Sequence, residues 1–116
     1  WPIVLDIEDA ASATARTAEM TQEQRTDCAV AFCETVRESG YTPMLYCNIR
    51  WFVEKLDIYR IQDYQKWFAQ YFSRPFFPYD FQIWQYSSTG RVEGIKGDVD
   101  LNLCFIDYSQ FSEELE

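Results

Sequence analysis

Two acidic residues, two positions apart, end an apolar segment at the start of the sequence, which reads Trp-Pro-Ile-Val-Leu-Asp-Ile-Glu over residues 1–8. Side chains alternate between the two faces of a β-strand, so a strand here places Asp6 and Glu8 on the same face. Their Cα atoms would lie about 6.5–7 Å apart, from a rise of about 3.3 Å per residue. Two carboxylates held side by side at a strand end are suited to general acid and base chemistry.

The residues around this pair predict where it lies in a fold. Ile3, Leu5 and Ile7 would face the other way, toward covering helices. A run that is apolar on both faces until acids appear at its end is typical of a buried parallel strand. In barrel enzymes the carboxyl ends of such strands carry the active site.

Composition narrows the chemistry further. The chain has 116 residues, enough for one domain, and its 47% hydrophobic and 18% aromatic content can fill a core. The aromatic excess would suit a groove of flat rings that binds sugar. The absence of histidine excludes histidine-activated nucleophiles and the usual zinc sites. Acids and bases must therefore be carboxylates, Tyr, Lys or Cys, and no metal or cofactor is indicated.

Charge and cysteine content bear on partners. A net charge of −9 argues against a nucleic-acid partner, which needs clustered positive charge. No apolar stretch is long enough to span a bilayer, and no signal peptide is recognised, so no membrane partner is expected. We expect the four cysteines to be buried thiols that act as small hydrophobic residues, with Cys47 and Cys104 in the core, and the sequence does not decide their disulfide state. The cysteines are Cys28, Cys33, Cys47 and Cys104.

The pattern of residues predicts α/β structure in the first half and mostly strands in the second. A capping box of Thr21 and Gln24 begins a helix over 21–39, which Gly40 ends. The first half continues with a strand over 42–47, a helix over 49–55 capped by Asn48, and a helical turn over 58–64. The second half has strands over 66–71 and 81–86, a turn over 87–90, and strands over 91–95 and 98–102. A short helix or turn over 112–116 ends the chain.

Alternation along the later strands places residues of one kind on common faces. The groups that share a face are Trp67, Ala69 and Tyr71, then Trp84 and Tyr86, then Asp98, Asp100 and Asn102. Aromatic and acidic groups would mix on both faces if their positions were random. We therefore expect rings and acids to meet at one site, with Asp98 as a turn residue.

Five segments in this order resemble glycoside hydrolase family 25, the lysozymes of the cellosyl and Chalaropsis type. They are residues 3–8, 40–48, 67–71, 84–87 and 94–102. The resemblance implies an α/β fold, the C-terminal part of an irregular TIM-like (β/α) barrel whose last strands lack helices. The family's first strand, with its Gly-Ile-Asp-type motif, and the strands after it have no counterpart here. Residues 1–116 would thus be a partial catalytic domain.

The resemblance also implies a function and a set of site residues. It implies a muramidase that hydrolyses the β-1,4 link between N-acetylmuramic acid and N-acetylglucosamine in peptidoglycan, secreted or phage-released and acting outside the cell or at the wall. Glu8 would be the general acid, Asp6 would orient or stabilise the reacting sugar, and Asp100 would be a further acid. The substrate-binding residues would be Trp67, Tyr71, Trp84, Tyr86 and, more weakly matched, Tyr46. Help from the substrate's N-acetyl group is expected.

Other interpretations stay open. Asp6 and Glu8 could be a solvated strand end, and each aromatic residue could pack in the core. The chain could also be an inactive truncated fragment or a carbohydrate-binding remnant. An acidic protein-interaction domain fits the aligned acids and rings less well. An opened barrel leaves two unpaired strand edges, so we expect the chain to need its missing N-terminal half or to self-associate.

Overall fold

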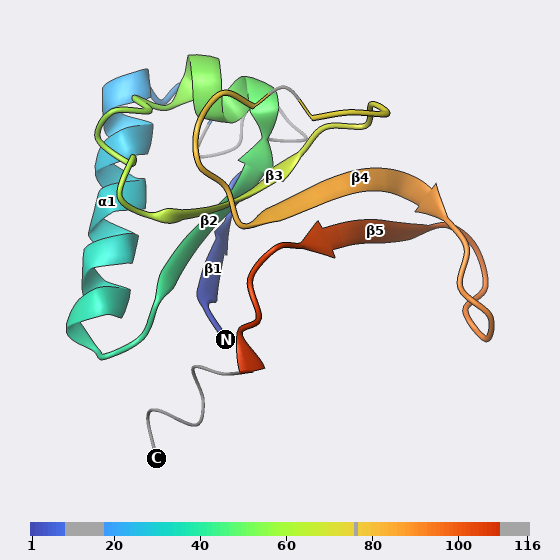
Figure 1. The fold of residues 1–116 in the computed structure, drawn as a ribbon. Coiled ribbons are helices and arrows are strands. Elements are labelled where there is room, and N and C mark those ends of the chain that lie inside the picture. Colours follow the sequence, from blue (N-terminus) through green and yellow to red (C-terminus); the bar gives the residue numbers. More distant parts are fainter. Residues whose placement is uncertain (9–17, 76, 110–116) are drawn as a thin grey trace.

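One mixed sheet organises the computed structural model, which describes residues 1–8, 18–75 and 77–109 (Figure 1). Its strand order is β1-β2-β3-β4-β5, with the first four strands parallel and β5 antiparallel to β4. The strands are β1 (Ile3–Asp6), β2 (Pro43–Asn48), β3 (Gln65–Ala69), β4 (Ile83–Gly90) and β5 (Val99–Cys104). The helices are α1 (Gln22–Glu38) and η1 (Trp51–Lys55). The expected partial α/β barrel with few late helices is confirmed.

Helix α1 follows β1 and packs on β1 and β2. Its start is the predicted capping box: the Thr21 hydroxyl accepts from the Gln24 backbone N–H, and the Gln24 side chain accepts from the Thr21 N–H. Gly40 follows the helix with a φ of 88°, a left-handed conformation that glycine adopts without strain. No helix among the described residues combines the length and the apolarity needed to cross a bilayer.

The hydrophobic core lies between the sheet and these helices. Phe68 of β3 is fully buried at its centre, and its ring stacks on Phe77 at a centroid distance of 5.0 Å. Phe81 meets the Phe68 ring edge-on at 4.7 Å. Leu45 and Phe52 are also fully buried in this cluster. One face of the sheet is therefore held by helices and aromatic packing, which leaves the other face free to carry polar groups.

Two predicted elements after β3 are wrong, the turn over 87–90 and the strand over 91–95. Residues 87–90 do not turn: β4 continues to Gly90 through two register irregularities, so its extra residues are absorbed without ending the strand. A Cβ at Gly90 would lie 2.4 Å from Leu101 Cδ1, so a larger residue there would have to displace the Leu101 side chain. The reversal falls within 91–98 instead, where Gly94 and Gly97 have φ values of 90° and 94°.

The other element predictions differ in smaller ways. Residues 58–63 form successive turns rather than a helical turn. The helix predicted over 49–55 is there, and its last part, η1, is wider than an α-helix. Cys33 and Cys47 are buried as expected, whereas the predictions that Cys28 and Cys104 are buried are wrong. Cys28 lies on the exposed side of α1, and Cys104 lies on β5 at the sheet edge. The tail predicted over 112–116 lies outside the described residues.

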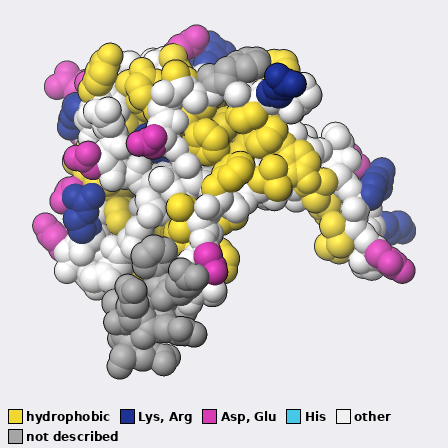
Figure 2. All heavy atoms as spheres, viewed as in Figure 1, with side chains coloured by type: hydrophobic (Ala, Val, Ile, Leu, Met, Phe, Trp, Pro, Cys, Tyr) yellow, Lys and Arg dark blue, Asp and Glu magenta, His cyan; other side chains and the backbone are white. Residues whose placement is uncertain are grey.

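Both edge strands of the sheet pair on one side only. Strand β1 is followed in the sheet by β2, and β5 by β4, so each has a free edge among the described residues. Large apolar side chains are exposed beside these edges, including Ile3 (40%), Leu103 (46%) and Phe105 (58%). Figure 2 shows apolar side chains gathered where the β4–β5 hairpin leaves the body. In native proteins, strand edges and apolar surface of this kind are normally covered by further structure or by a partner.

Buried weak acids predict that the fold loses stability in alkali. Burial raises the pKa of the Cys33 thiol from 9.0 to about 12. Burial raises that of Tyr108 from 10.0 to about 12, and burial with a hydrogen bond to Glu34 does the same for Tyr64. These groups resist ionisation only when folded, so their stabilising contribution is complete below about pH 9 and is lost as pH rises toward 12. Burial lowers the pKa of Lys66, which opposes this trend.

The measurement is the urea midpoint of unfolding at pH 7, 9, 10 and 11. We expect the midpoint to fall steadily above pH 9. Cys33→Ala should make the decrease in the urea midpoint just above pH 9 smaller. Cys28→Ala, at an exposed position, should leave the dependence of the midpoint on pH unchanged. A midpoint that stays constant to pH 11 would contradict the burial of these groups.

Candidate active site

A cleft of about 480 Å³ lies on the sheet face opposite the helices, and we call it the inner cleft. All five strands or their ends contribute to it. Its described lining residues are Val4, Asp6, Glu8, Tyr46, Trp67, Gln85 and Asp100. Strand register explains the set: Asp6 pairs with Tyr46, and Tyr46 pairs with Trp67, so side chains of one parity point into one space.

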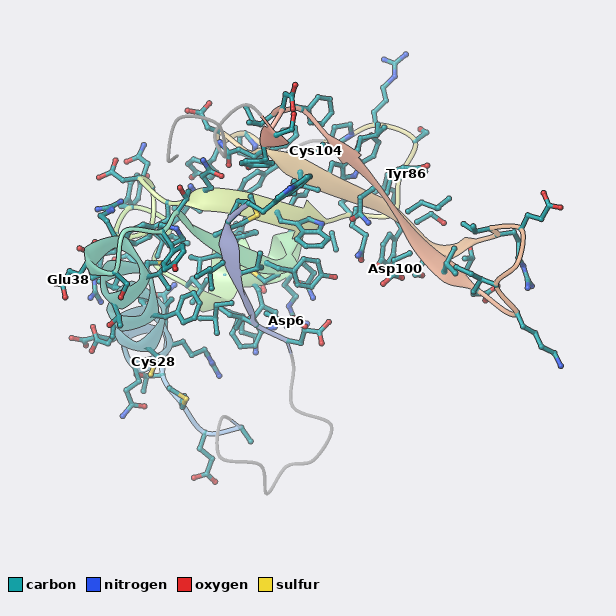
Figure 3. All side chains as sticks on the ribbon, turned by 90° about the horizontal axis from the view of Figure 1, so that it is seen from below. Asp6, Cys28, Glu38, Tyr86, Asp100 and Cys104 are labelled. Atoms are coloured by element: carbon teal, nitrogen blue, oxygen red, sulfur yellow. The ribbon has the colours of Figure 1, made fainter. Side chains whose placement is uncertain are left out.

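The three predicted acids come together in this cleft. Asp6 and Glu8 extend from the end of β1, and Asp100 reaches across from β5. Figure 3 shows Asp6 and Asp100 on the same side of the sheet. All three side chains are exposed, and none hydrogen-bonds or ion-pairs with another described residue. They line the same cleft as Trp67, and their oxygens are open to a ligand rather than used to hold the fold.

Asp98 has a different role, as the sequence predicted. It lies just before β5 in the reversal of the β4–β5 hairpin, where its carboxylate pairs with Arg91 at 3.2 Å. Both side chains are largely exposed. It does not line the inner cleft, so the site has one acid from this segment, Asp100.

A hydrogen-bonded group of polar side chains forms one wall of the inner cleft. Gln85 Oε1 accepts from the Tyr46 hydroxyl at 2.9 Å and from the Tyr71 hydroxyl at 2.7 Å. The Trp67 indole N–H donates to Asn102 Oδ1 at 2.8 Å, and the Trp67 ring meets Tyr46 edge-on at 5.1 Å. These hydrogen bonds and the ring contact hold side chains from β2 to β5 together on one surface.

The Tyr46 hydroxyl lies in the electrostatic field of the acids. Burial is the first cause that raises the pKa of its hydroxyl, followed by the neighbouring Tyr71 and the charges of Glu8, Asp6 and Asp100. The hydroxyl therefore stays protonated at neutral pH, and its hydrogen goes to Gln85. Tyr46 was the weakest of the sequence candidates, yet it lines the inner cleft beside all three acids.

A second cleft of about 610 Å³, which we call the upper cleft, adjoins the first. Its described lining residues are Glu8, Tyr46, Asn48, Ile49, Ala69, Gln70, Tyr71 and Phe72. Glu8 and Tyr46 belong to both clefts, so Glu8 lies at their junction. The exposed rings of Tyr71 (53%) and Phe72 (59%) line the upper cleft. An extended ligand could pass Glu8 with contacts on both sides.

The structure corrects the prediction that Trp84 and Tyr86 line the groove. Trp84 pairs with Phe68 in register, so it points into the core, where it is 8% exposed and donates its indole N–H to the Gln70 carbonyl oxygen. Tyr86 packs against the same core cluster and the Trp84 ring. In Figure 3, Tyr86 lies on the other side of the β4–β5 hairpin from Asp100. Neither ring lines either cleft.

Sequence reasoning missed Gln85 and Asn48, which line the clefts, and Asn102, which holds the Trp67 indole. Gln85 takes the inner-cleft face because its neighbour Trp84 takes the core face. Alternation along 84–86 was the available signal, since a buried Trp84 places Gln85 opposite it.

Among the described residues there is no group of three or more cysteine, aspartate and glutamate side chains suited to a metal ion.

Comparison with known proteins gives one family and two similar structures. A sequence model described as glycosyl hydrolases family 25 matches residues 1–95. The fold matches the CTP1L endolysin with a TM-score of 0.72 at 24% identity, over 99% of this chain and 39% of that chain. It matches the Clostridium perfringens spore cortex lytic enzyme SleM with a TM-score of 0.64 at 23% identity, over 85% of this chain and 35% of that chain. No match was found among curated proteins.

Proposed function

Because the chain belongs to glycosyl hydrolases family 25, we propose that it forms part of a muramidase that hydrolyses peptidoglycan. The bond cut is the β-1,4 link between N-acetylmuramic acid and N-acetylglucosamine. The two structural neighbours are named as an endolysin and a cortex lytic enzyme, which supports a cell-wall substrate. Such an enzyme works outside the cell or at the wall, whether secreted or released by a phage.

The observation that carries the proposal is the position of Glu8 at the junction of the two clefts. A glycan lying through both clefts would present a glycosidic oxygen to Glu8, which protonates it as general acid. Asp6, on the same strand face, orients the reacting sugar or stabilises its developing positive charge. Asp100 faces them from β5 as a further acid.

The rings of the two clefts would hold the sugar. Trp67 and Tyr46 offer faces and edges in the inner cleft, and Tyr71 in the upper cleft. Trp84 and Tyr86 support this wall from the core side instead of binding the glycan. Aromatic rings suit the apolar faces of pyranose sugars because each buries a large area at little entropic cost.

We further propose that residues 1–116 are one part of the catalytic domain. The chain spans 39% and 35% of the two similar structures. The free edges of β1 and β5 would be covered by further strands of the same domain or by a second copy of this chain. A sugar-binding part without turnover is the second candidate, and the open sheet favours it for the chain on its own.

The test is product analysis after digestion of purified peptidoglycan by the domain completed with these strands. New reducing ends are reduced with borohydride, hydrolysed and identified. We expect reduced muramic acid, because the proposed cleavage leaves muramic acid at the new reducing end. Reduced glucosamine, or released peptide amines without new reducing sugars, would contradict the muramidase assignment.

A further inference from the structure

Hydrogen-bond donors are scarce in the inner cleft, whereas acceptors are plentiful. Asp6, Glu8 and Asp100 supply carboxylate oxygens there. Two described lining groups that could donate are already committed: the Tyr46 hydroxyl to Gln85 and the Trp67 indole to Asn102. A protonated Glu8 has one hydrogen, which the proposed reaction gives to the leaving oxygen.

The Gln85 amide is the exception. The side chain is 4% exposed, and its Oε1 accepts two tyrosine hydroxyl hydrogens from Tyr46 and Tyr71. Those bonds fix the oxygen end of the amide, so the Nε2 end has a fixed direction too. No described residue accepts the Nε2 hydrogens, and the nitrogen is not sealed from the cleft. A nearly buried amide N–H needs an acceptor, which a ligand can supply.

We propose that Gln85 recognises and positions a carbonyl oxygen of the bound sugar, the acceptor of an N-acetyl group. This rests on the proposed function. Sugar hydroxyls can donate to the surrounding carboxylates, but an amide carbonyl has no hydrogen to give and requires a donor. Gln85 is the uncommitted neutral donor among the described lining residues. It makes the cleft selective for N-acetylated sugars over plain glucans, which lack that carbonyl.

Two variants remove this donor in different ways. Gln85→Glu keeps oxygen atoms for both tyrosine hydroxyls but has no N–H, and Gln85→Met removes donor and acceptor without adding charge. Gln82→Glu is the matched control, because it makes the same chemical change outside both clefts. Gln82 Oε1 accepts from the Lys66 backbone N–H, and a glutamate oxygen can do the same.

The measurement is the affinity of the 116-residue chain for triacetylchitotriose and for cellotriose, by calorimetry. We expect the unaltered chain and Gln82→Glu to prefer triacetylchitotriose. Both Gln85 variants should lose about tenfold in affinity for triacetylchitotriose, the effect of leaving a buried carbonyl without its donor. The affinity of the uncharged variant Gln85→Met for cellotriose should change by less than about twofold.

A second readout separates contact with the sugar from a structural role. In ¹⁵N-labelled chain, the side-chain amide resonances of Gln85 should shift with triacetylchitotriose and stay in place with cellotriose. Undiminished triacetylchitotriose binding by Gln85→Met, or an equal loss for both sugars, would overturn the role of Gln85 and leave the proposed function standing. An unaltered chain that binds neither trisaccharide would overturn the role of Gln85 in this chain, whereas the proposed function is overturned only by the product analysis of the completed domain.

Discussion

Replacing Glu8 by Gln is expected to reduce peptidoglycan hydrolysis by about 10²–10⁴-fold in the completed domain, the usual contribution of a general acid. Glutamine has nearly the same shape but no acidic proton for the leaving oxygen. Glu8 is exposed and has no hydrogen bond to a described residue, so the free energy of unfolding should be unchanged. Both quantities are needed: initial rates from reducing ends, and stability from urea unfolding.

Glu54→Gln provides the control for this substitution. Glu54 is an exposed glutamate that pairs with Arg50 on the surface and lines neither cleft. The same chemical change there removes a surface ion pair, which contributes little, and should leave turnover unaffected. If Glu8→Gln retained turnover while folded, Glu8 could not be the acid, and Asp6 or Asp100 would be the remaining carboxylates of the inner cleft.

The shared direction of Asp6 and Glu8 was predictable from the sequence because it depends on local geometry alone. Alternation places these two side chains on one face in any strand, whereas Tyr46 and Trp67 come alongside only through parallel pairing. The helix from Gln22 to Glu38 was predictable for the same reason, since its capping box lies within four residues. Such features need no knowledge of distant parts of the chain.

The wrong predictions concern side-chain directions and a turn position that are decided by pairing between strands distant in the sequence. Alternation shows that Trp84 and Tyr86 share a face, but register against Phe68 decides that this face is the core. A glutamine in an apolar strand gives no sign of its role until the fold brings Tyr46 and Tyr71 to it, from 39 and 14 residues away. Gly90 indicates a turn locally, yet its reason is Leu101 on the neighbouring strand.

Phe68→Ala is expected to destabilise the fold by about 3–5 kcal/mol, the range for removing a buried aromatic ring from a core. The Phe68 side chain is fully buried and contacts the rings of Phe77 and Phe81, so its removal would leave a cavity and take away these ring contacts. Phe72→Ala is the control, because that ring is 59% exposed and its loss should change the unfolding free energy by less than about 0.5 kcal/mol.

This pair of variants also tests how the site is supported. Phe68 and Trp67 are neighbours on β3 with opposite directions, so the ring cluster behind the strand holds the wall of the inner cleft in place. Phe68→Ala should therefore weaken trisaccharide binding as well as stability, although Phe68 touches no ligand. Because Phe72 lines the upper cleft, its loss should affect binding without affecting stability. A loss of less than about 1 kcal/mol in Phe68→Ala would mean that the aromatic cluster is not what stabilises this sheet.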